Sequence, residues 1–207
     1  MEPPFIFDPD PPLAEIKALV REHHYSGCLP SSIVYVAGVR QGGALVAGIV
    51  YSTPPTRWSQ PVVELGRLVR KPGTKPPLTM LISKSVKVLA KRKNADLVVS
   101  FADSTQGHHG GVYQAASWNF HETRKPSCDG FVIDGVFTPR RALNHRLGSS
   151  SVPRITAFYE VWGGDCRPHY DTGKHLYWRA LAPSGLAKAN LLGLHRRPYP
   201  KPFGDIA

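Results

Sequence analysis

The spacing of hydrophobic residues separates the expected helices of this chain from its expected strands. Three segments have apolar positions three and four residues apart, with polar residues on the other side, as in an amphipathic helix. They cover residues 13–23, 78–93 and 112–118. Gly27 lies just beyond the first segment and is a natural stop for a helix.

Runs of apolar and β-branched residues predict strands over residues 32–39, 44–51, 62–70, 97–102, 131–135 and 175–181. The segment Gln41-Gly42-Gly43 joins the first two strands as a tight hairpin. The resulting order is a helix, three antiparallel strands, and then helices alternating with strands. Because this is the layout of the GNAT acyltransferase fold, we expect an α/β fold with a mixed central sheet flanked by helices.

The composition fits a globular protein with one catalytic domain. The chain has 207 residues, of which 42% are hydrophobic, and we place the domain at residues 13–182. Residues 1–12 form a Pro-rich lead-in, and residues 183–207 form a basic, Pro-rich tail. Signal-peptide and membrane-span patterns are missing, and the three cysteines form no CxxC pair. We therefore expect a soluble cytoplasmic protein without membrane contact, as a monomer or a homodimer.

The charge is strongly positive and uneven. The formal net charge is +11, and residues 67–93 contain nine basic and no acidic side chains. A concentrated positive charge favours a polyanionic partner, because each neutralised phosphate releases counterions. A merely solvated basic surface is the alternative. If DNA is the partner, the residues expected to contact it are Lys84, Lys87, Arg140, Arg141 and Arg146.

The chemistry is expected where the strand over residues 97–102 ends. Asp103 follows that strand, His108 and His109 lie in the next turn, and Tyr113 lies in the following helix. In open α/β sheets, ligands bind at this position relative to a strand. Asp103 is a candidate general base and Tyr113 a candidate general acid, whereas loop histidines are more often solvated.

Two other places in the chain hold candidate residues. His24 and Tyr25 lie at the end of the first helix, where they are either functional or simply packed and solvated. Glu64 and Arg67 lie inside a strand, where a charge is costly unless it is paired or faces a site. A structural ion pair is the alternative for these two residues.

The turn after the third strand of the hairpin sheet resembles an anion site. It leads into a helix N-terminus, where free backbone N–H groups and the helix dipole favour phosphate. It matches neither a Walker A loop nor a dinucleotide fingerprint. A plain basic loop is the alternative. The residues expected to bind a cofactor here are Leu68, Val69, Arg70, Lys71, Gly73, Thr74, Lys75, Leu78 and Thr79.

Four motifs in order resemble the Mom family of phage DNA-modification proteins, a divergent branch of the GNAT fold. They are HHYSG (23–27), VELGRLV (63–69), LVVSFAD (97–103) and GHHGGVYQAASW (107–118), and the resemblance covers about residues 13–180. It implies a phage-encoded enzyme that uses acetyl-CoA to convert adenine in double-stranded DNA to the N6-methylcarbamoyl form. That modification would protect phage DNA from host restriction endonucleases.

The same resemblance implies roles for individual residues. The implied catalytic residues are His24, Tyr25, Glu64, Arg67, Asp103 and Tyr113. The family is also linked to iron, for which His24, Tyr25, Asp103 and Tyr113 would be a reasonable ligand set. The turn over residues 70–79 departs from the usual GNAT turn in its prolines and its missing second glycine.

Chemistry on the adenine amino group requires the base to leave the stack. Tyr25, Trp58 and Trp118 are the aromatic candidates to hold a flipped base, although Trp118 also fits a core position. Two other functions remain open: a GNAT N-acetyltransferase that acts on a small-molecule, protein or modified-base amine, and a non-catalytic DNA-binding protein.

Overall fold

The computed structural model describes residues 2–54, 58–139 and 165–201, and its contacts divide the chain into two compact units. The first unit contains residues 1–102, 109–122 and 175–207, and the second contains residues 103–108 and 123–174. None of the described helices is long and apolar enough to span a membrane.

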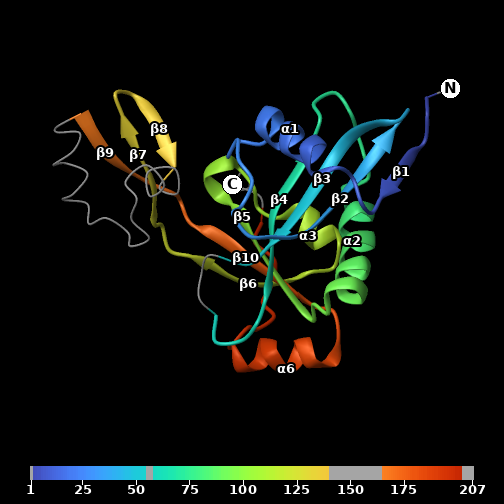
Figure 1. Cartoon of the computed structure of the whole chain (residues 1–207). Coiled ribbons are helices and arrows are strands. Elements are labelled where there is room, and N and C mark those ends of the chain that lie inside the picture. The colour runs from blue at the N-terminus through green and yellow to red at the C-terminus, as the bar shows by residue number, and fades with distance from the viewer. Residues whose placement is uncertain (1, 55–57, 140–164, 202–207) are drawn as a thin grey trace. The chain divides into compact units, whose positions relative to one another are not determined.

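A seven-stranded mixed sheet lies mainly in the first unit, with the strand order β1-β2-β3-β4-β5-β10-β6 (Figure 1). Strands β1 to β4 pair antiparallel, and β4 pairs parallel with β5 after the crossover through α2. The strands are β1 (Phe5–Asp8), β2 (Ile33–Gln41), β3 (Ala44–Ser52), β4 (Val63–Arg70), β5 (Leu97–Asp103), β6 (Asn119–Arg124) and β10 (Lys174–Ala180). The predicted fold class, a mixed sheet flanked by helices, is confirmed.

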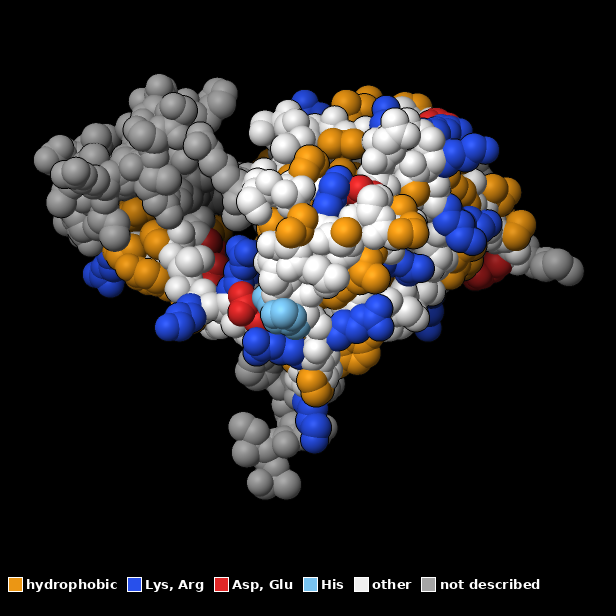
Figure 2. Space-filling model, turned by 90° about the horizontal axis from the view of Figure 1, so that it is seen from below, with side chains coloured by type: hydrophobic (Ala, Val, Ile, Leu, Met, Phe, Trp, Pro, Cys, Tyr) orange, Lys and Arg blue, Asp and Glu red, His pale blue; other side chains and the backbone are white. Residues whose placement is uncertain are grey.

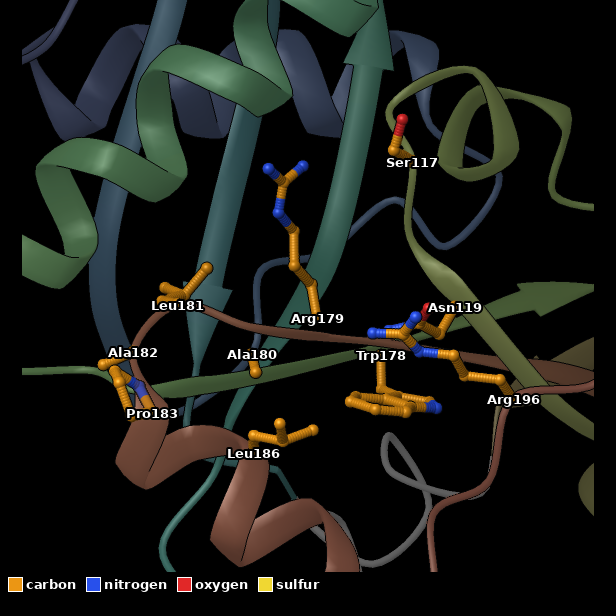
Figure 3. A pocket seen from close by; sticks show the side chains of 10 residues that line it. All are labelled: Ser117, Asn119, Trp178, Arg179, Ala180, Leu181, Ala182, Pro183, Leu186 and Arg196. Atoms are coloured by element: carbon orange, nitrogen blue, oxygen red, sulfur yellow. The ribbon is translucent and has the colours of Figure 1, made fainter.

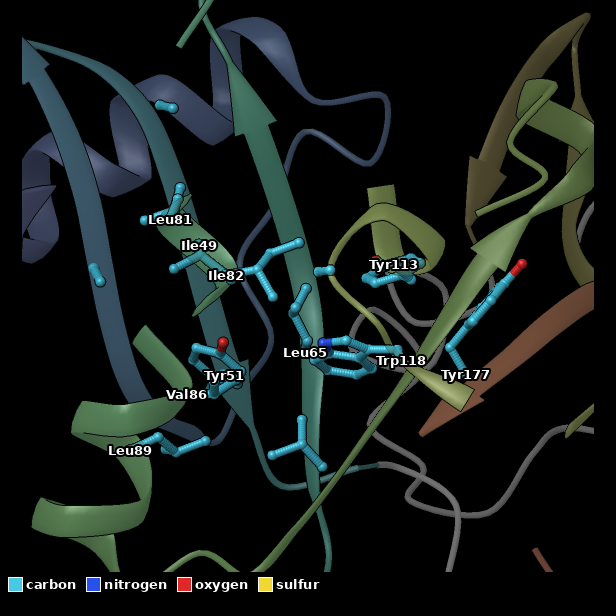
Figure 4. Packing of buried hydrophobic residues seen from close by; sticks show 14 of the residues in the cluster. Ile49, Tyr51, Leu65, Leu81, Ile82, Val86, Leu89, Tyr113, Trp118 and Tyr177 are labelled. Atoms are coloured by element: carbon cyan, nitrogen blue, oxygen red, sulfur yellow. The ribbon is translucent and has the colours of Figure 1, made fainter. Parts of the chain in front are cut away.

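Two helices cover opposite faces of this sheet, which explains why β3 is apolar on both sides. Helix α1 (Leu13–His23) packs Ile16 and its neighbours on a cluster that includes Val50. Helix α2 (Leu78–Lys93) packs on the cluster that includes Ile49 and Tyr51 (Figure 4). Successive residues of a strand point to opposite faces of the sheet. Ile49 and Tyr51 therefore face α2, whereas Val50 faces α1.

Several elements lie where the sequence analysis placed none. Strand β1 lies within the expected lead-in of residues 1–12, and its register with β2 runs from Phe5 opposite Gln41 to Asp8 opposite Gly38. Helix α6 (Pro183–Leu191) lies within the expected tail, with Ala189 in a core cluster beside Trp178. The Pro-rich composition of the tail did not indicate a helix, but proline is well tolerated in the first turn of a helix, where Pro183 lies.

The helix expected over residues 112–118 is shorter than predicted. Helix α3 spans Gly111–Ala115, and Ser117 then adopts a left-handed conformation with φ of 59°. This conformation redirects the chain, so that Trp118 enters the core and β6 begins at Asn119. Among the described residues, the expected third helix is therefore a single short turn followed by a strand.

The second unit contains a small antiparallel sheet in the order β8-β7-β9. Its strands are β7 (Cys128–Ile133), β8 (Val136–Pro139) and β9 (Cys166–Tyr170). Asp134 and Gly135 join β7 to β8 with φ angles of 49° and 78°. Positive φ at both central residues is the pattern of a type I′ hairpin turn, which Asp-Gly favours.

Candidate active site

A β-bulge interrupts β4 at the centre of the sheet. Tyr51 of β3 pairs with Leu65 and the preceding Val50 pairs with Arg67, so Gly66 is an extra residue on β4. A Cβ atom at Gly66 would lie 3.2 Å from the Ser52 hydroxyl, which is tight. A side chain at position 66 would therefore press against Ser52, and the bulge re-aims the side chains that follow it.

The pairing between β4 and β5 stops at the same point. It covers Val63 to Leu65 of β4 and Val98 to Ser100 of β5, although β4 continues to Arg70 and β5 to Asp103. The backbone N–H and C=O groups of β4 beyond Leu65 are therefore not paired with β5. Such groups can pair with an extended ligand, as an exposed sheet edge does in strand addition.

A buried polar pair lies beside this point of separation. The Ser100 side chain is fully buried, and its hydroxyl oxygen lies 2.9 Å from the Leu65 carbonyl oxygen and 2.8 Å from the Tyr113 hydroxyl oxygen. Burial raises the pKa of Tyr113 to about 12, although the hydrogen bond with Ser100 acts in the opposite direction. Tyr113 therefore keeps its proton at neutral pH.

The loop after α1 is fastened to β4 by Arg67. Its Nε atom donates to the Cys28 carbonyl at 2.9 Å, and Nη1 donates to the Gly66 carbonyl at 2.6 Å. In the same loop, His24 and Tyr25 stack with 4.4 Å between ring centroids, and the Tyr25 side chain is exposed. Arg67 of the motif at residues 63–69 therefore contacts Cys28, which directly follows the motif at residues 23–27.

Tyr25 and Glu64 lie close enough to Tyr113 that negative charge on either would raise its pKa further. The end of α1, the bulged strand β4 and helix α3 thus bring five predicted residues into one neighbourhood of the first unit. These residues are His24, Tyr25, Glu64, Arg67 and Tyr113.

Asp103 belongs to the second unit, and its neighbours there give it a structural role as well. One carboxylate oxygen accepts a hydrogen bond from the Thr105 backbone N–H at 3.1 Å, and the other lies 3.5 Å from Nζ of Lys174. The same ammonium lies 3.4 Å from Asp171, whose pKa is lowered: burial opposes this, but hydrogen bonds from Ser127 and Gly173 outweigh it.

The turn that contains His108 and His109 requires glycine at position 110. Gly110 has φ of 84°, and a Cβ atom there would enter the ring of Tyr177. The Tyr177 hydroxyl donates to the His109 carbonyl at 2.7 Å, which holds the turn against β10. His108 is exposed and His109 half-buried.

The expected anion site leads into the N-terminus of α2. No side chain caps this helix, and its first turn contains no acidic residue. Gly73 has φ of 77°, and Thr74 closes the turn onto the Lys71 carbonyl. The prolines at positions 72, 76 and 77 lack N–H donors, so few backbone donors remain for a phosphate.

The chain matches the Mom protein family over residues 11–201. It belongs to the Mom protein family. The four motifs that predicted this membership all lie within the matched region. No curated protein matches the sequence.

Several solved acetyltransferase structures resemble that of the Mom-family chain. A GNAT acetyltransferase from Elizabethkingia anophelis with acetyl-CoA bound is 13% identical, with a TM-score of 0.45, over 86% of this chain and 98% of that one. The Thermoplasma acidophilum paia N-acetyltransferase in complex with coenzyme A is 14% identical, with a TM-score of 0.43, over 58% and 92%. A Bacillus subtilis acetyltransferase in complex with CoA is 12% identical, with a TM-score of 0.43, over 88% and 100%. Identities this low do not extend the ligands of those proteins to the Mom-family chain.

The structure does not support an iron site formed by the four predicted ligands. Nδ1 of His24 accepts a hydrogen bond from the Ser26 backbone N–H at 3.1 Å, so the proton of the neutral ring lies on Nε2. The Tyr113 hydroxyl oxygen lies 2.8 Å from the Ser100 hydroxyl oxygen, and an Asp103 carboxylate oxygen lies 3.5 Å from Nζ of Lys174. Among the described residues, no three His, Cys, Asp or Glu side chains form a metal-binding group. We derive no step through a metal.

The predicted DNA contacts divide into two groups. Arg140, Arg141 and Arg146 lie outside the described residues. Lys84 and Lys87 are exposed on α2, and Lys84 lies 5.7 Å from the centre of the Phe7 ring. Figure 2 shows basic side chains spread widely over one face of the Mom-family protein, with few acidic ones. Of the aromatic candidates, Trp118 is buried in the core, whereas Tyr25 is exposed.

Three residues of the site were not predicted as functional: Ser100, Gly66 and Cys28. A serine within the apolar run of residues 97–102 was the available signal for Ser100, because a buried hydroxyl needs partners. Gly66 sits in a strand interior, which often marks a bulge. Cys28 contributes its backbone carbonyl, for which the sequence carries no signal.

Proposed function

We propose that this Mom-family protein is an acyl-CoA-dependent transferase that modifies the N6 amine of adenine in double-stranded DNA to N6-methylcarbamoyladenine. The observation that carries the proposal is the proton-bearing Tyr113 hydroxyl beside the point where β4 and β5 separate. The substrate class in this proposal is the one that the resemblance of the four motifs to the Mom family implies. The biological role that follows is protection of phage DNA from restriction in the cytoplasm of the bacterial host.

The unpaired edge of β4 suits the extended arm of a coenzyme A thioester. Backbone groups beyond Leu65 can pair with its amides, and the α2 N-terminus and basic turn can hold its phosphates. The residues proposed for this role are Leu68, Val69, Arg70, Lys71, Gly73, Thr74, Lys75, Leu78 and Thr79. The three prolines of the turn imply that the lysines replace some of the missing backbone donors.

The transfer step needs a base for the incoming amine and an acid for the leaving thiolate. The adenine nitrogen forms a bond to the thioester carbonyl carbon, and the bond between that carbon and sulfur breaks. Tyr113 gives its proton to the thiolate, and a general base, for which the sequence predicts Asp103, takes the amine proton. Arg67 positions the His24–Tyr25 loop, whose exposed Tyr25 ring offers a stacking surface for a flipped base.

The methylcarbamoyl product contains a nitrogen that an acetyl group lacks. Acetyl transfer alone would give N6-acetyladenine. With ammonia as the nitrogen donor, formation of the methylcarbamoyl group also removes two electrons and two protons, so the complete reaction requires both a nitrogen donor and a two-electron oxidant. The methylcarbamoyl product differs from N6-acetyladenine by one nitrogen and one hydrogen, so the mass of the product distinguishes the two reactions.

The test is mass spectrometry of nucleosides from plasmid DNA recovered from bacteria that express the protein. We expect a deoxyadenosine with the mass of the methylcarbamoyl form, and we expect it to vanish in a strain that expresses a soluble Asp103→Asn variant. N6-acetyldeoxyadenosine would indicate an ordinary acetyl transfer to DNA. Unmodified DNA from soluble wild-type protein would contradict the proposal, and would favour either a small-molecule acetyltransferase or a non-catalytic DNA-binding protein.

A further inference from the structure

A basic groove lies in the first unit, apart from the residues assigned above to transfer. Two adjoining cavities of about 480 and about 500 Å³ share Arg179, Ala180 and Leu181, at the end of β10. One continues to Arg196, Ser117 and Asn119, as Figure 3 shows. The other continues along α2 to Lys87 and Lys91. We use the term basic groove for the surface of Lys87, Lys91, Arg179 and Arg196 with these polar neighbours.

The four cations of the basic groove are not neutralised by described carboxylates. Other basic residues are: Arg40 pairs with Asp8 and Glu15, Arg92 with Asp10, and Lys188 with Asp96. No ion pair within 4.0 Å joins Lys87, Lys91, Arg179 or Arg196 to a carboxylate in the part of the chain that the structure describes. Four uncompensated cations along one surface favour an anionic ligand.

The groove is also partly pre-organised. Nη1 of Arg179 donates to the Ala116 carbonyl at 2.7 Å, which holds a half-buried guanidinium in place. A guanidinium has five N–H donors, so others remain for a ligand. Asn119 and Ser117 add an amide and a hydroxyl at the same wall. Fixed donors of this kind suit phosphate oxygens, which arginine recognises well.

The groove lies far along α2 from the turn proposed to hold coenzyme A. Lys87 and Lys91 are nine and thirteen residues after Leu78, which places them roughly 14 and 20 Å along the helix axis. Phosphates bound at the helix N-terminus are therefore not those that the groove would bind. Lys87 and Lys91 themselves are one turn apart on the same face, about 6 Å between Cβ atoms, and can contact neighbouring phosphates of a polymer.

We propose that the basic groove binds the sugar–phosphate backbone of the DNA substrate. The proposal rests on the proposed function, because it assumes that DNA is the substrate. It adds Lys91, Arg179 and Arg196 to the DNA-binding surface, and it places the contact at the end of α2 and β10. Backbone contacts of this type set position and affinity without reading sequence.

The test compares the salt dependence of DNA binding in two double variants of the full chain. Lys87→Gln/Lys91→Gln removes two cations of the groove, and Lys17→Gln/Arg21→Gln removes two exposed cations with the same spacing on α1, which packs on the opposite sheet face. Both lower the net charge equally. Affinity for a duplex is measured between about 50 and about 200 mM salt.

We expect the groove variant to lower the slope of log affinity against log salt by about 2, for every duplex sequence. The affinity ratio between the two salt concentrations then shrinks by about tenfold, whereas the α1 variant keeps the wild-type slope. Equal slopes in wild type and groove variant would overturn the proposal. Displacement of DNA by saturating coenzyme A, or tighter binding of an RNA duplex, would also overturn it.

Failure of the groove proposal differs from failure of the proposed function. If the wild-type protein binds and modifies DNA but the groove variant keeps its slope, only the groove assignment is wrong. If the wild-type protein binds no DNA at any salt concentration, the substrate assignment itself is contradicted. Arg196→Gln provides a third measurement, because Arg196 is exposed and its loss should lower the slope by about 1 without affecting the core.

Discussion

Tyr113 and Tyr51 are two buried tyrosines with similar surroundings and different places in the fold. The Tyr51 hydroxyl lies 2.8 Å from Ser85 of α2, and burial raises its pKa, as it does for Tyr113. Burial, a serine partner and a raised pKa are therefore common to both residues. Only the serine partner of Tyr113, Ser100, also contacts Leu65, where the pairing of β4 with β5 ends. For this reason we propose a catalytic role for Tyr113 and not for Tyr51.

Replacing each tyrosine by phenylalanine tests that distinction. Either change removes one buried hydrogen bond and should lower the free energy of unfolding by about 1 kcal/mol. Tyr113→Phe also removes the proton donor, so we expect the rate of DNA modification to fall roughly 100- to 10,000-fold. Tyr51→Phe should keep the wild-type rate. Stability is measured by urea denaturation, and rate by the appearance of the modified nucleoside.

Equal rates in the two variants would remove Tyr113 from the mechanism. A loss of activity in both, matched by a loss of folded protein, would indicate a structural role only.

At the scale of elements, the sequence pattern predicted the hairpin strands, α1, α2 and β5, because each has a regular apolar period and clear ends. It did not predict the bulge in β4. Alternation along residues 63–69 is consistent with an unbroken strand, and only the cross-strand register shows that Gly66 is extra. The four motifs predicted candidate residues for the site, which stay a prediction, but they did not predict the Ser100–Tyr113 pair or the Arg67–Cys28 contact. Those depend on residues distant in sequence.

Helix α6 makes a second packing contact that the sequence pattern did not predict. Gly185 lies buried where the helix touches the Asp96 backbone, and a Cβ atom there would collide with the Asp96 carbonyl. Nothing in the sequence around Gly185 indicates that contact, because Asp96 lies in the connection between α2 and β5.

Gly185→Ala should therefore lower the free energy of unfolding by about 1 to 3 kcal/mol, although alanine is the better helix former. Asn190→Ala, at an exposed position of the same helix, is the control and should be neutral or slightly stabilising. Thermal unfolding of both variants measures the difference. An unchanged or higher melting temperature for Gly185→Ala would mean that α6 does not pack closely on Asp96.

At the scale of the whole molecule, the net charge of +11 is unevenly distributed. Several acidic residues are used in ion pairs with Arg40, Arg92, Lys174 and Lys188, so the remaining cations dominate the surface. Basic residues of the β4–α2 turn and of the basic groove provide two separate places for phosphates. Under the proposed function, the first would hold a small cofactor and the second a polymer.

The central claim is that acyl-CoA carbon is transferred to adenine in DNA. The most direct test incubates the purified protein with a DNA duplex and acetyl-CoA that is isotopically labelled in its acetyl group. Ammonium or a small-molecule extract of bacteria is added as the nitrogen source, and the deoxynucleosides are then analysed by mass spectrometry. We predict that the label appears in a modified deoxyadenosine and that Tyr113→Phe abolishes it. Unlabelled DNA together with a labelled acetylated small amine would contradict the account.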